Sequence, residues 1–525
     1  MVGALLFTAI VAFAQSGPIT RTFSDEDARK VVAFWAMPDR YTAETPPSAA
    51  RDGKWVVRLT PQGSTWLHAV IKARGGPKVP PGQVAPPLTP QQRIWEEWID
   101  RRVAQDRWQA SLTAHERNLN DGGLAVPVID LAQAPLNAGP LPDDLAVLVG
   151  EPPALAEVVS PRRHTVRFGA GDEYQCTDNP PMRARYAYYR FAEGVMSGGE
   201  SVRRMPENDL KRLFTRAGIE GSLYRILQSV SVLEGGFDSI NTYDTGYVSV
   251  GVIQFAALSG GGGSLGRVLL RAKRTDPKAF ARDFRQYGVD VTPEGRLAVI
   301  DPATGQEFQG PDANLAIIRD KRLTAVFPRA GKKCEPFRVA QLQVAVEDYY
   351  PGNDRVTVFV DGNAMTARVN EIVRSEAGLA TLMDRKVNTG SLAPFADVLG
   401  GLAKELGVRS LSALADFEGR IVTLLRYRKD YLADVTLQQP RDRATLPSRS
   451  GPPRGSTRTD GTPPPVNSGP GTVLPPPTTE EPIARREDGS QLGQPPKGEP
   501  PRPTVMSPHP RVEPPIGGPV DNPGL

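Results

Sequence analysis

The sequence predicts an α+β fold: a mainly helical central region with a small β part, a separate N-terminal α/β region and a proline-rich tail. Apolar residues recur at helical spacing just before residue 234. The segment YVSVGVIQF, which follows shortly afterwards, is typical of β-structure. From residue 440 to 525 the chain is rich in proline and has no Phe, Trp or Tyr, so it cannot bury enough apolar surface to fold. The apolar residues that recur at helical spacing before residue 234 are Leu223, Ile226, Leu227, Val230 and Leu233.

Length and composition indicate several units. A chain of 525 residues with 52 prolines and 51 glycines is too long for one compact core and too rich in proline to be folded throughout. Its 63 basic and 59 acidic residues leave a net charge of +4, a small excess for this length. We therefore do not expect a nucleic-acid partner, whereas an anionic polymer is compatible with the charge.

The N-terminus predicts export. Residues 1–17 read MVGALLFTAIVAFAQSG, an apolar stretch that ends in Ala12-Phe13-Ala14, which is the pattern of a signal-peptide cleavage site. We expect a signal peptide over residues 1–14. A buried strand is the alternative, since no Lys or Arg precedes the apolar residues. No later apolar run approaches the ~20 residues of a membrane span.

Cysteine and histidine usage does not predict a metal or cofactor. Cys176 and Cys334 are not in a C-x-x-C motif, and two interpretations remain open: one disulfide that closes a long loop, or two separate buried thiols. The four histidines are far apart and form no H-E-x-x-H motif, so neither a zinc site nor any other cofactor is expected.

The N-terminal region, residues 20–136, is expected to be a separate domain because it holds every tryptophan. Acidic residues after Ser24 predict a helix start, KWVVRLT predicts a strand, and residues 89–118 predict a long helix. Trp95 and Trp98 share a helix face, which is typical of a core rather than of a sugar-stacking platform. The tryptophans are Trp35, Trp55, Trp66, Trp95, Trp98 and Trp108.

Three further regions follow. Residues 137–205 contain short strand-like runs such as RRHTVRF and are expected to form a β-rich connecting region. Residues 206–434 are expected to form a mainly helical domain with a minor β part. Residues 435–525 are expected to be a disordered tail with polyproline character.

Glu234 is the candidate general acid. It ends the apolar helix, and Gly235 and Gly236 are suited to a helix C-cap. The negative end of the helix dipole and apolar neighbours both raise the pKa of a carboxyl group, which a general acid requires near neutral pH. The alternative is an ordinary helix-end residue.

A second carboxyl group follows Glu234. Asp244 lies in an Asp-Thr-Gly turn, and the β-rich segment after the turn returns the chain towards the helix end. Asp238 is the alternative second acid, unless it pairs with an arginine.

These residues resemble the lysozyme superfamily, most closely its chitosanase-like branch. A Glu that ends an apolar helix is followed by Asp-x-x-x-x-Ser-x-Gly and an aliphatic run that ends in Phe. The resemblance implies that Glu234 is the general acid, that Asp244 activates water and that Ser249 positions the water. The interval from Glu to Asp is shorter here than in the chitosanases.

The same stretch is similar to the lytic transglycosylases of peptidoglycan, in which Glu precedes Gly-x-x-x-x-Asn and then Ser-x-Gly-x-x-Gln. The residues that fit this pattern are Glu234, Gly236, Asn241, Ser249, Gly251 and Gln254. Those enzymes use one catalytic Glu, which would leave Asp244 a structural role.

The resemblance implies a lysozyme-like catalytic domain and an exported glycoside hydrolase. We expect the enzyme to cleave a β-1,4-linked amino-sugar polymer, with peptidoglycan as the favoured substrate and Glu234 as the general acid. The alternatives are a chitosanase, a lytic transglycosylase and a non-catalytic wall-binding protein. The expected location is secreted or periplasmic, at the cell wall, and the oligomeric state is left open. The substrate-binding candidates are Tyr243, Tyr247, Gln254 and Asn241.

Overall fold

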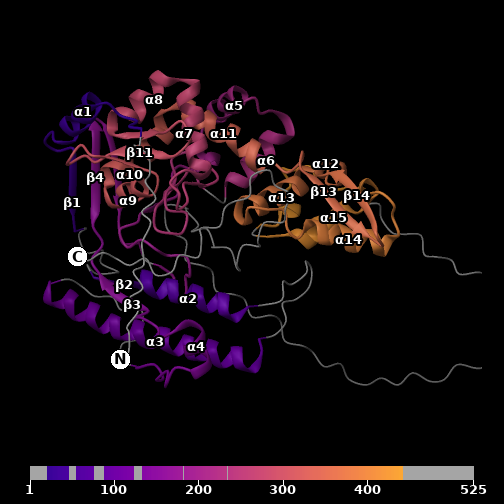
Figure 1. Ribbon diagram of the computed structural model, residues 1–525, viewed down its shortest axis with the longest axis horizontal. Coiled ribbons are helices and arrows are strands. Elements are labelled where there is room, and N and C mark those ends of the chain that lie inside the picture. The colour runs from indigo at the N-terminus through magenta and orange to yellow at the C-terminus, as the bar shows by residue number, and fades with distance from the viewer. Residues whose placement is uncertain are drawn as a thin grey trace, which may run out of the picture.

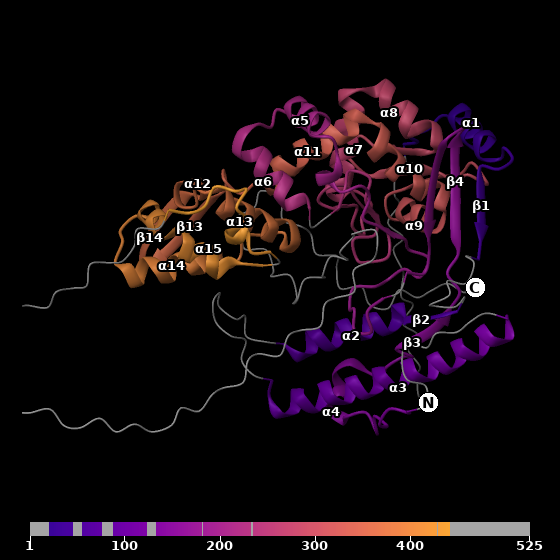
Figure 2. The same cartoon turned by 180° about the vertical axis from the view of Figure 1, so that it is seen from behind.

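The computed structural model describes residues 20–45, 55–75, 88–122, 133–180, 182–232, 235–427 and 429–441. The expected signal peptide, Glu234 and most of the expected tail lie outside these residues. The described part is a mixed α+β fold, as predicted. Figures 1 and 2 show three parts from opposite sides: a main body, a helical layer beneath it and a C-terminal lobe at its side.

The main body contains most of the elements. Its helices are α1 (Asp25–Trp35), α5 (Glu207–Arg216), α6 (Gly221–Ser231), α7 (Gly263–Thr275), α8 (Pro277–Asp283), α9 (Pro311–Arg319), α10 (Lys321–Lys333) and α11 (Glu335–Tyr349), with the short 3-10 turns Val202–Arg204 and Arg285–Tyr287. Its strands are β1 (Tyr41–Glu44), β4 (Arg163–Gly169), β5 (Asp172–Thr177), β6 (Met196–Ser197), β7 (Ile240–Asn241), β8 (Ser249–Val250), β9 (Phe255–Ala256), β10 (Val289–Val291), β11 (Leu297–Ile300) and β12 (Glu307–Gln309).

The main body holds three antiparallel sheets, each small. Their strand orders are β1-β4-β5, β10-β11-β12 and β6-β7-β8-β9. The last sheet follows α6 and carries most of the predicted site residues.

The helical layer consists of β2 (Val56–Leu59), α2 (Pro61–Arg74), α3 (Pro90–Asn120), α4 (Asp143–Val149) and β3 (Ala156–Val159). It has a hydrophobic core of its own around Trp66, Trp95 and Trp98. The indole N–H of Trp95 donates to Asp144 and that of Trp98 to the Gly139 carbonyl. The core role expected for these two tryptophans is confirmed.

The C-terminal lobe consists of β13 (Arg355–Val360), β14 (Asn363–Arg368), α12 (Val369–Ile372), α13 (Glu376–Thr389), α14 (Phe395–Leu406) and α15 (Glu418–Leu425), with the 3-10 turns Leu411–Phe417 and Tyr431–Ala433. Strands β13 and β14 form a hairpin. Helix α13 packs against α6, and the lobe shares one continuous core with the main body.

The N-terminal boundary differs from the expectation. Residues 20–45 belong to the main body instead of joining the helical layer. Trp35 is buried among main-body residues and its indole N–H donates to the Tyr287 carbonyl at 3.1 Å, while β1 pairs with β4. The connecting region 137–205 is divided in the same way, because β3 pairs with β2 of the layer whereas β4 and β5 extend the sheet of β1.

The described chain also continues beyond the expected start of the tail at residue 435. Leu437 is buried, and the backbone N–H of Gln438 donates to Glu376 at 3.0 Å. The hydrogen bond ties Gln438 to α13, so described residues of the expected tail pack on the fold.

Cys176 and Cys334 are both buried and both free. Of the two interpretations left open by the sequence, the structure therefore supports two separate thiols. Burial raises the pKa of each thiol to about 12.

Within the described ranges, no helix combines the length and the apolar character that crossing a membrane requires.

Candidate functional site

The predicted site begins where α6 ends. The helix ends at Ser231, with Val232 as its C-cap, three residues earlier than the sequence pattern predicts. Leu233 and Glu234 lie outside the described residues, so the structure does not place the candidate acid. The chain is described again from Gly235, whose N–H donates to the Ser231 carbonyl at 3.2 Å.

The two glycines after Glu234 allow a close backbone contact. The N–H of Gly236 donates to the Gly198 carbonyl at 2.9 Å, and a Cβ at Gly236 would lie 2.0 Å from the Glu200 carbonyl oxygen. Gly235 has a φ of 130°, which glycine adopts readily. A side chain at either position would push the chain away from residues 198–200.

The sheet β6-β7-β8-β9 brings Asn241 and Ser249 together. They are directly paired residues on β7 and β8, and Ser249 in turn pairs with Ala256 on β9. Tyr243, Asp244 and Tyr247 lie on the connection between β7 and β8. Ser249 is buried, and its hydroxyl packs on Gly246, where a Cβ would lie 2.5 Å from its Oγ.

Both carboxylate oxygens of Asp244 accept local hydrogen bonds. Oδ1 accepts from the Gly246 N–H and Oδ2 from Asn241 Nδ2, each at 2.8 Å. The other side-chain atom of Asn241, Oδ1, accepts from the Tyr243 N–H at 3.0 Å. Burial raises the pKa of the Asp244 carboxyl, although these donors and the positive charge of Arg190 act in the opposite direction. Asp244 therefore closes the turn that carries it.

The remaining polar candidates make internal contacts. Gln254 Nε2 donates to Ser239 Oγ at 2.6 Å, and that hydroxyl donates to the Gly251 carbonyl at 2.9 Å. Asp238 is buried; its Oδ1 accepts from the Glu200 N–H at 2.7 Å, and its Oδ2 lies 3.5 Å from Lys332 Nζ. The partner of Asp238 is thus a lysine and a backbone amide rather than an arginine.

A row of aromatic rings leads from the site to the helical layer. The rings of Tyr243 and Tyr186 are 6.0 Å apart, those of Tyr186 and Tyr188 are 5.9 Å apart, and those of Tyr188 and His68 are 5.6 Å apart. All four side chains are partly buried. Beside this row, Tyr247 packs on Phe191 at 5.0 Å. Rings that combine an apolar face with a polar edge are suited to binding sugars.

Arg190 joins the aromatic row to the helical layer and to the main body. Its side chain donates to Ser64 Oγ on α2 at 3.2 Å and to the Ala187 and Tyr189 carbonyls, while its backbone N–H donates to the Tyr243 carbonyl. Burial lowers the pKa of His68 to about 4, and Arg190 acts in the same direction, so the His68 ring is neutral at pH 7.

Gln341 is a positioning residue that the sequence did not reveal. It is fully buried on α11; its Nε2 donates to the Phe237 carbonyl at 3.0 Å, and its Oε1 accepts from the Val252 N–H at 3.1 Å. One side chain therefore holds both ends of the loop that contains the predicted site. A polar residue among the apolar positions of α11 was the only local signal.

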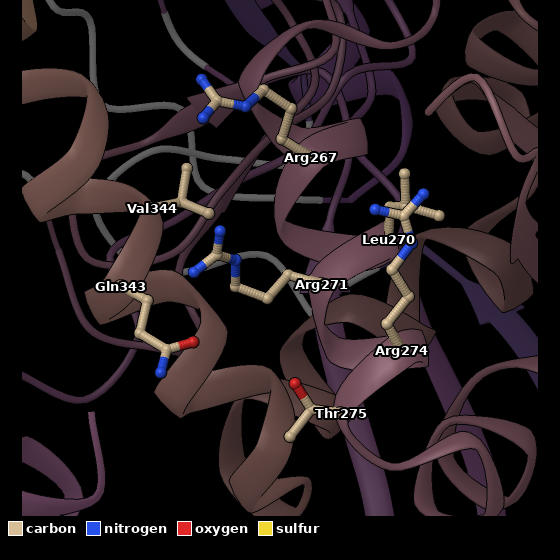
Figure 3. A pocket seen from close by; sticks show the side chains of 7 residues that line it. All are labelled: Arg267, Leu270, Arg271, Arg274, Thr275, Gln343 and Val344. Atoms are coloured by element: carbon tan, nitrogen blue, oxygen red, sulfur yellow. The ribbon is translucent and has the colours of Figure 1, made fainter. Parts of the chain in front are cut away.

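One cavity lies elsewhere, between α7 and α11 (Figure 3). Its lining contains none of the predicted site residues.

Within the residues that the structure describes, no group of three or more His, Cys, Asp and Glu side chains is arranged to hold a metal ion. Comparison with protein-family models, with curated proteins and with solved structures finds no match to the chain.

Proposed function

We propose that the protein is an exported glycan-cleaving enzyme with a lysozyme-like catalytic domain, acting on the β-1,4-linked amino-sugar polymer of peptidoglycan. Glu234 protonates the glycosidic oxygen as the bond breaks. The motif that supports this assignment orders Glu234, Asn241, Ser249 and Gln254 along one short segment.

The observation that carries the proposal is the aromatic row beside this segment. It ends at Tyr243, two residues from Asn241, and extends through Tyr186 and Tyr188 to His68. A chain of several sugar units packs on several successive apolar faces, and aromatic rings that follow one another beside the predicted site favour such a surface here. The helical layer thereby contributes to the proposed substrate site.

The contacts of Asp244 favour cleavage with a single acid. A base that activates water needs a carboxylate oxygen directed at that water, whereas both oxygens of Asp244 accept hydrogen bonds from their own loop. This supports lytic transglycosylation, in which the sugar's own 6-hydroxyl attacks C1 as the glycosidic bond breaks, closes a 1,6-anhydro ring and passes its proton to the Glu234 carboxylate. Hydrolysis with Asp244 as base is the second candidate and requires carboxyl groups ~6.5–9.5 Å apart.

Chitosan is a weaker substrate candidate than peptidoglycan. It is a polycation, and the net charge of +4 does not attract it. Peptidoglycan carries carboxylates, which suits a slightly basic protein.

The proposal predicts that Glu234→Gln abolishes release of soluble fragments from purified peptidoglycan. Loss of a general acid lowers the rate by about 10²–10⁴. The matched control is Glu220→Gln, an exposed residue at the start of α6, which should retain wild-type release. Wild-type release by Glu234→Gln with an unchanged circular dichroism spectrum would exclude Glu234 as the acid. Tight binding without release by the wild type would favour a wall-binding protein.

A further inference from the structure

The cavity between α7 and α11 has a volume of about 440 Å³, and three of its seven lining residues are arginines. Arg267, Arg271 and Arg274 rise from α7, and Gln343 and Val344 face them from α11 (Figure 3). Ligand pockets generally have volumes of roughly 300–1,000 Å³, so this cavity can hold a small organic molecule.

Two of the arginines are held in place by acidic residues of α11. Glu347 accepts hydrogen bonds from Arg271 at 2.6 and 2.8 Å and lies 3.7 Å from Arg267. Asp348 pairs with Arg267. These ion pairs orient two guanidinium groups at the cavity before any ligand arrives, which lowers the ordering cost of binding.

Arg274 is not matched in this way. It is exposed, and no ion pair to it occurs in the described part of the chain. Three guanidinium groups therefore face two carboxylates, and one positive charge is left without a counter-charge. The spacing of four and three residues places all three arginines on the same face of α7.

The rest of the lining is apolar or neutral. Leu270 and Val344 offer apolar surface, while Gln343 and Thr275 offer polar groups without charge. A bare inorganic ion would leave the apolar part unused, whereas an organic anion can use both parts of the cavity.

We propose that this cavity binds a small organic anion that carries carboxylate or phosphate groups, with Arg274 as its principal charged contact. The planar guanidinium fork matches both groups through paired hydrogen bonds. This site is separate from the proposed glycan site and does not depend on glycan cleavage.

Isothermal titration calorimetry at fixed ionic strength tests the proposal, with citrate and phenyl phosphate as probes of the two groups. We expect saturable binding of at least one probe by the full chain. Arg274→Ala should weaken it about tenfold. Arg274→Lys keeps the charge but loses the fork and should fall in between. Arg212→Ala, an exposed arginine of α5, is the matched control and should bind like the wild type.

Saturation by citrate alone would assign a carboxylate ligand, and saturation by phenyl phosphate alone would assign a phosphate ligand. Absence of saturation with both probes would overturn the proposal. Equal affinities of the wild type and Arg274→Ala would overturn it as well. Because Arg274 is exposed, its replacement is not expected to disturb the fold, and a melting curve checks this.

Discussion

Asp244 is the residue on which the choice between hydrolysis and transglycosylation depends. Its two oxygens bind the Gly246 N–H and the Asn241 amide, and these bonds hold the turn between β7 and β8. The same contacts would orient Asn241, Tyr243 and Ser249 whether or not Asp244 takes part in the reaction.

Asp244→Asn separates a positioning role from a catalytic one. Asparagine keeps an oxygen for the Gly246 N–H, loses the hydrogen bond from Asn241 Nδ2, and removes the charge that a base requires. If Asp244 positions the turn, the rate of peptidoglycan cleavage should fall less than about tenfold, whereas loss of a base lowers it by about 10²–10⁴. Initial rates of fragment release at a fixed protein concentration measure the difference. A loss as large as that of Glu234→Gln would restore Asp244 as the base.

Individual residues also show how far the sequence predicted the site. Asn241, Asp244 and Ser249 lie together because only a short turn separates β7 from β8, so their proximity could be predicted. Arg190 and Gln341 could not be predicted in this way. Gln341 is 104 positions from Phe237, and no local pattern relates two residues at that separation.

At the scale of the element, Gln341 connects α11 to the site loop. Gln341→Leu would leave the Phe237 carbonyl and the Val252 N–H buried without partners. Each such group costs about 1–3 kcal/mol, so the free energy of unfolding should fall by roughly 3 kcal/mol. Urea denaturation measures this free energy of unfolding. The matched control is Gln286→Leu, which replaces an exposed glutamine and should change the free energy of unfolding by about 0.5 kcal/mol or less. Equal effects of the two replacements would argue against the connection.

Helix α1 depends on a charged cap. Burial acts to raise the pKa of Asp27, yet hydrogen bonds from Ser24 and the Arg285 guanidinium hold it at about 2. The ordinary value is about 3.9. Because the pKa is lowered on folding, the ionised group stabilises the fold above about pH 4, and this contribution is lost as the pH falls towards 2.

Asp27→Asn should therefore lower the melting temperature at pH 7, with a difference from the wild type that shrinks between about pH 4 and pH 2. Thermal melts followed by circular dichroism at a series of pH values measure this difference. Asp361→Asn, in the exposed turn between β13 and β14, serves as the control. A difference that stays constant down to pH 2 would contradict the role of the charge.

Elements with local signals were predicted, whereas the partners of strands that pair over long intervals were not. Ser24 and Thr89 cap α1 and α3 and mark their starts in the sequence. Strand β8 and the start of β9 lie within YVSVGVIQF, which was predicted as β-structure, and they pair across short intervals. Strand β6 has only two residues, too few for an alternating pattern to be recognised, and it pairs with β7 across a long interval that only the tertiary fold specifies.

The residues that the structure describes form two separate hydrophobic cores. Trp66, Trp95 and Trp98 lie in the core of the helical layer, whereas Trp35 lies in the core of the main body. Tryptophan enrichment grouped Trp35 with the other tryptophans, because composition carries no information on which core a residue joins.

The two cores predict that unfolding is not a single transition. Leu67→Ala, in the helical layer, should shift the urea transition seen by tryptophan fluorescence, since a buried Leu→Ala replacement costs about 2–5 kcal/mol. Leu269→Ala, in the main body, should chiefly shift the transition seen by far-ultraviolet circular dichroism. Transitions that coincide for the wild type and move together in both variants would indicate one cooperative unit.

Mass spectrometry of the products from purified peptidoglycan tests whether Glu234 acts in glycan cleavage. We predict that the wild type releases fragments with 1,6-anhydro ends, lighter by one water than hydrolysis products, and that Glu234→Gln releases none. Ordinary reducing ends would keep Glu234 as the acid and assign Asp244 as the base. Absence of any released fragment from the wild type, or identical fragments from both proteins, would contradict this role of Glu234.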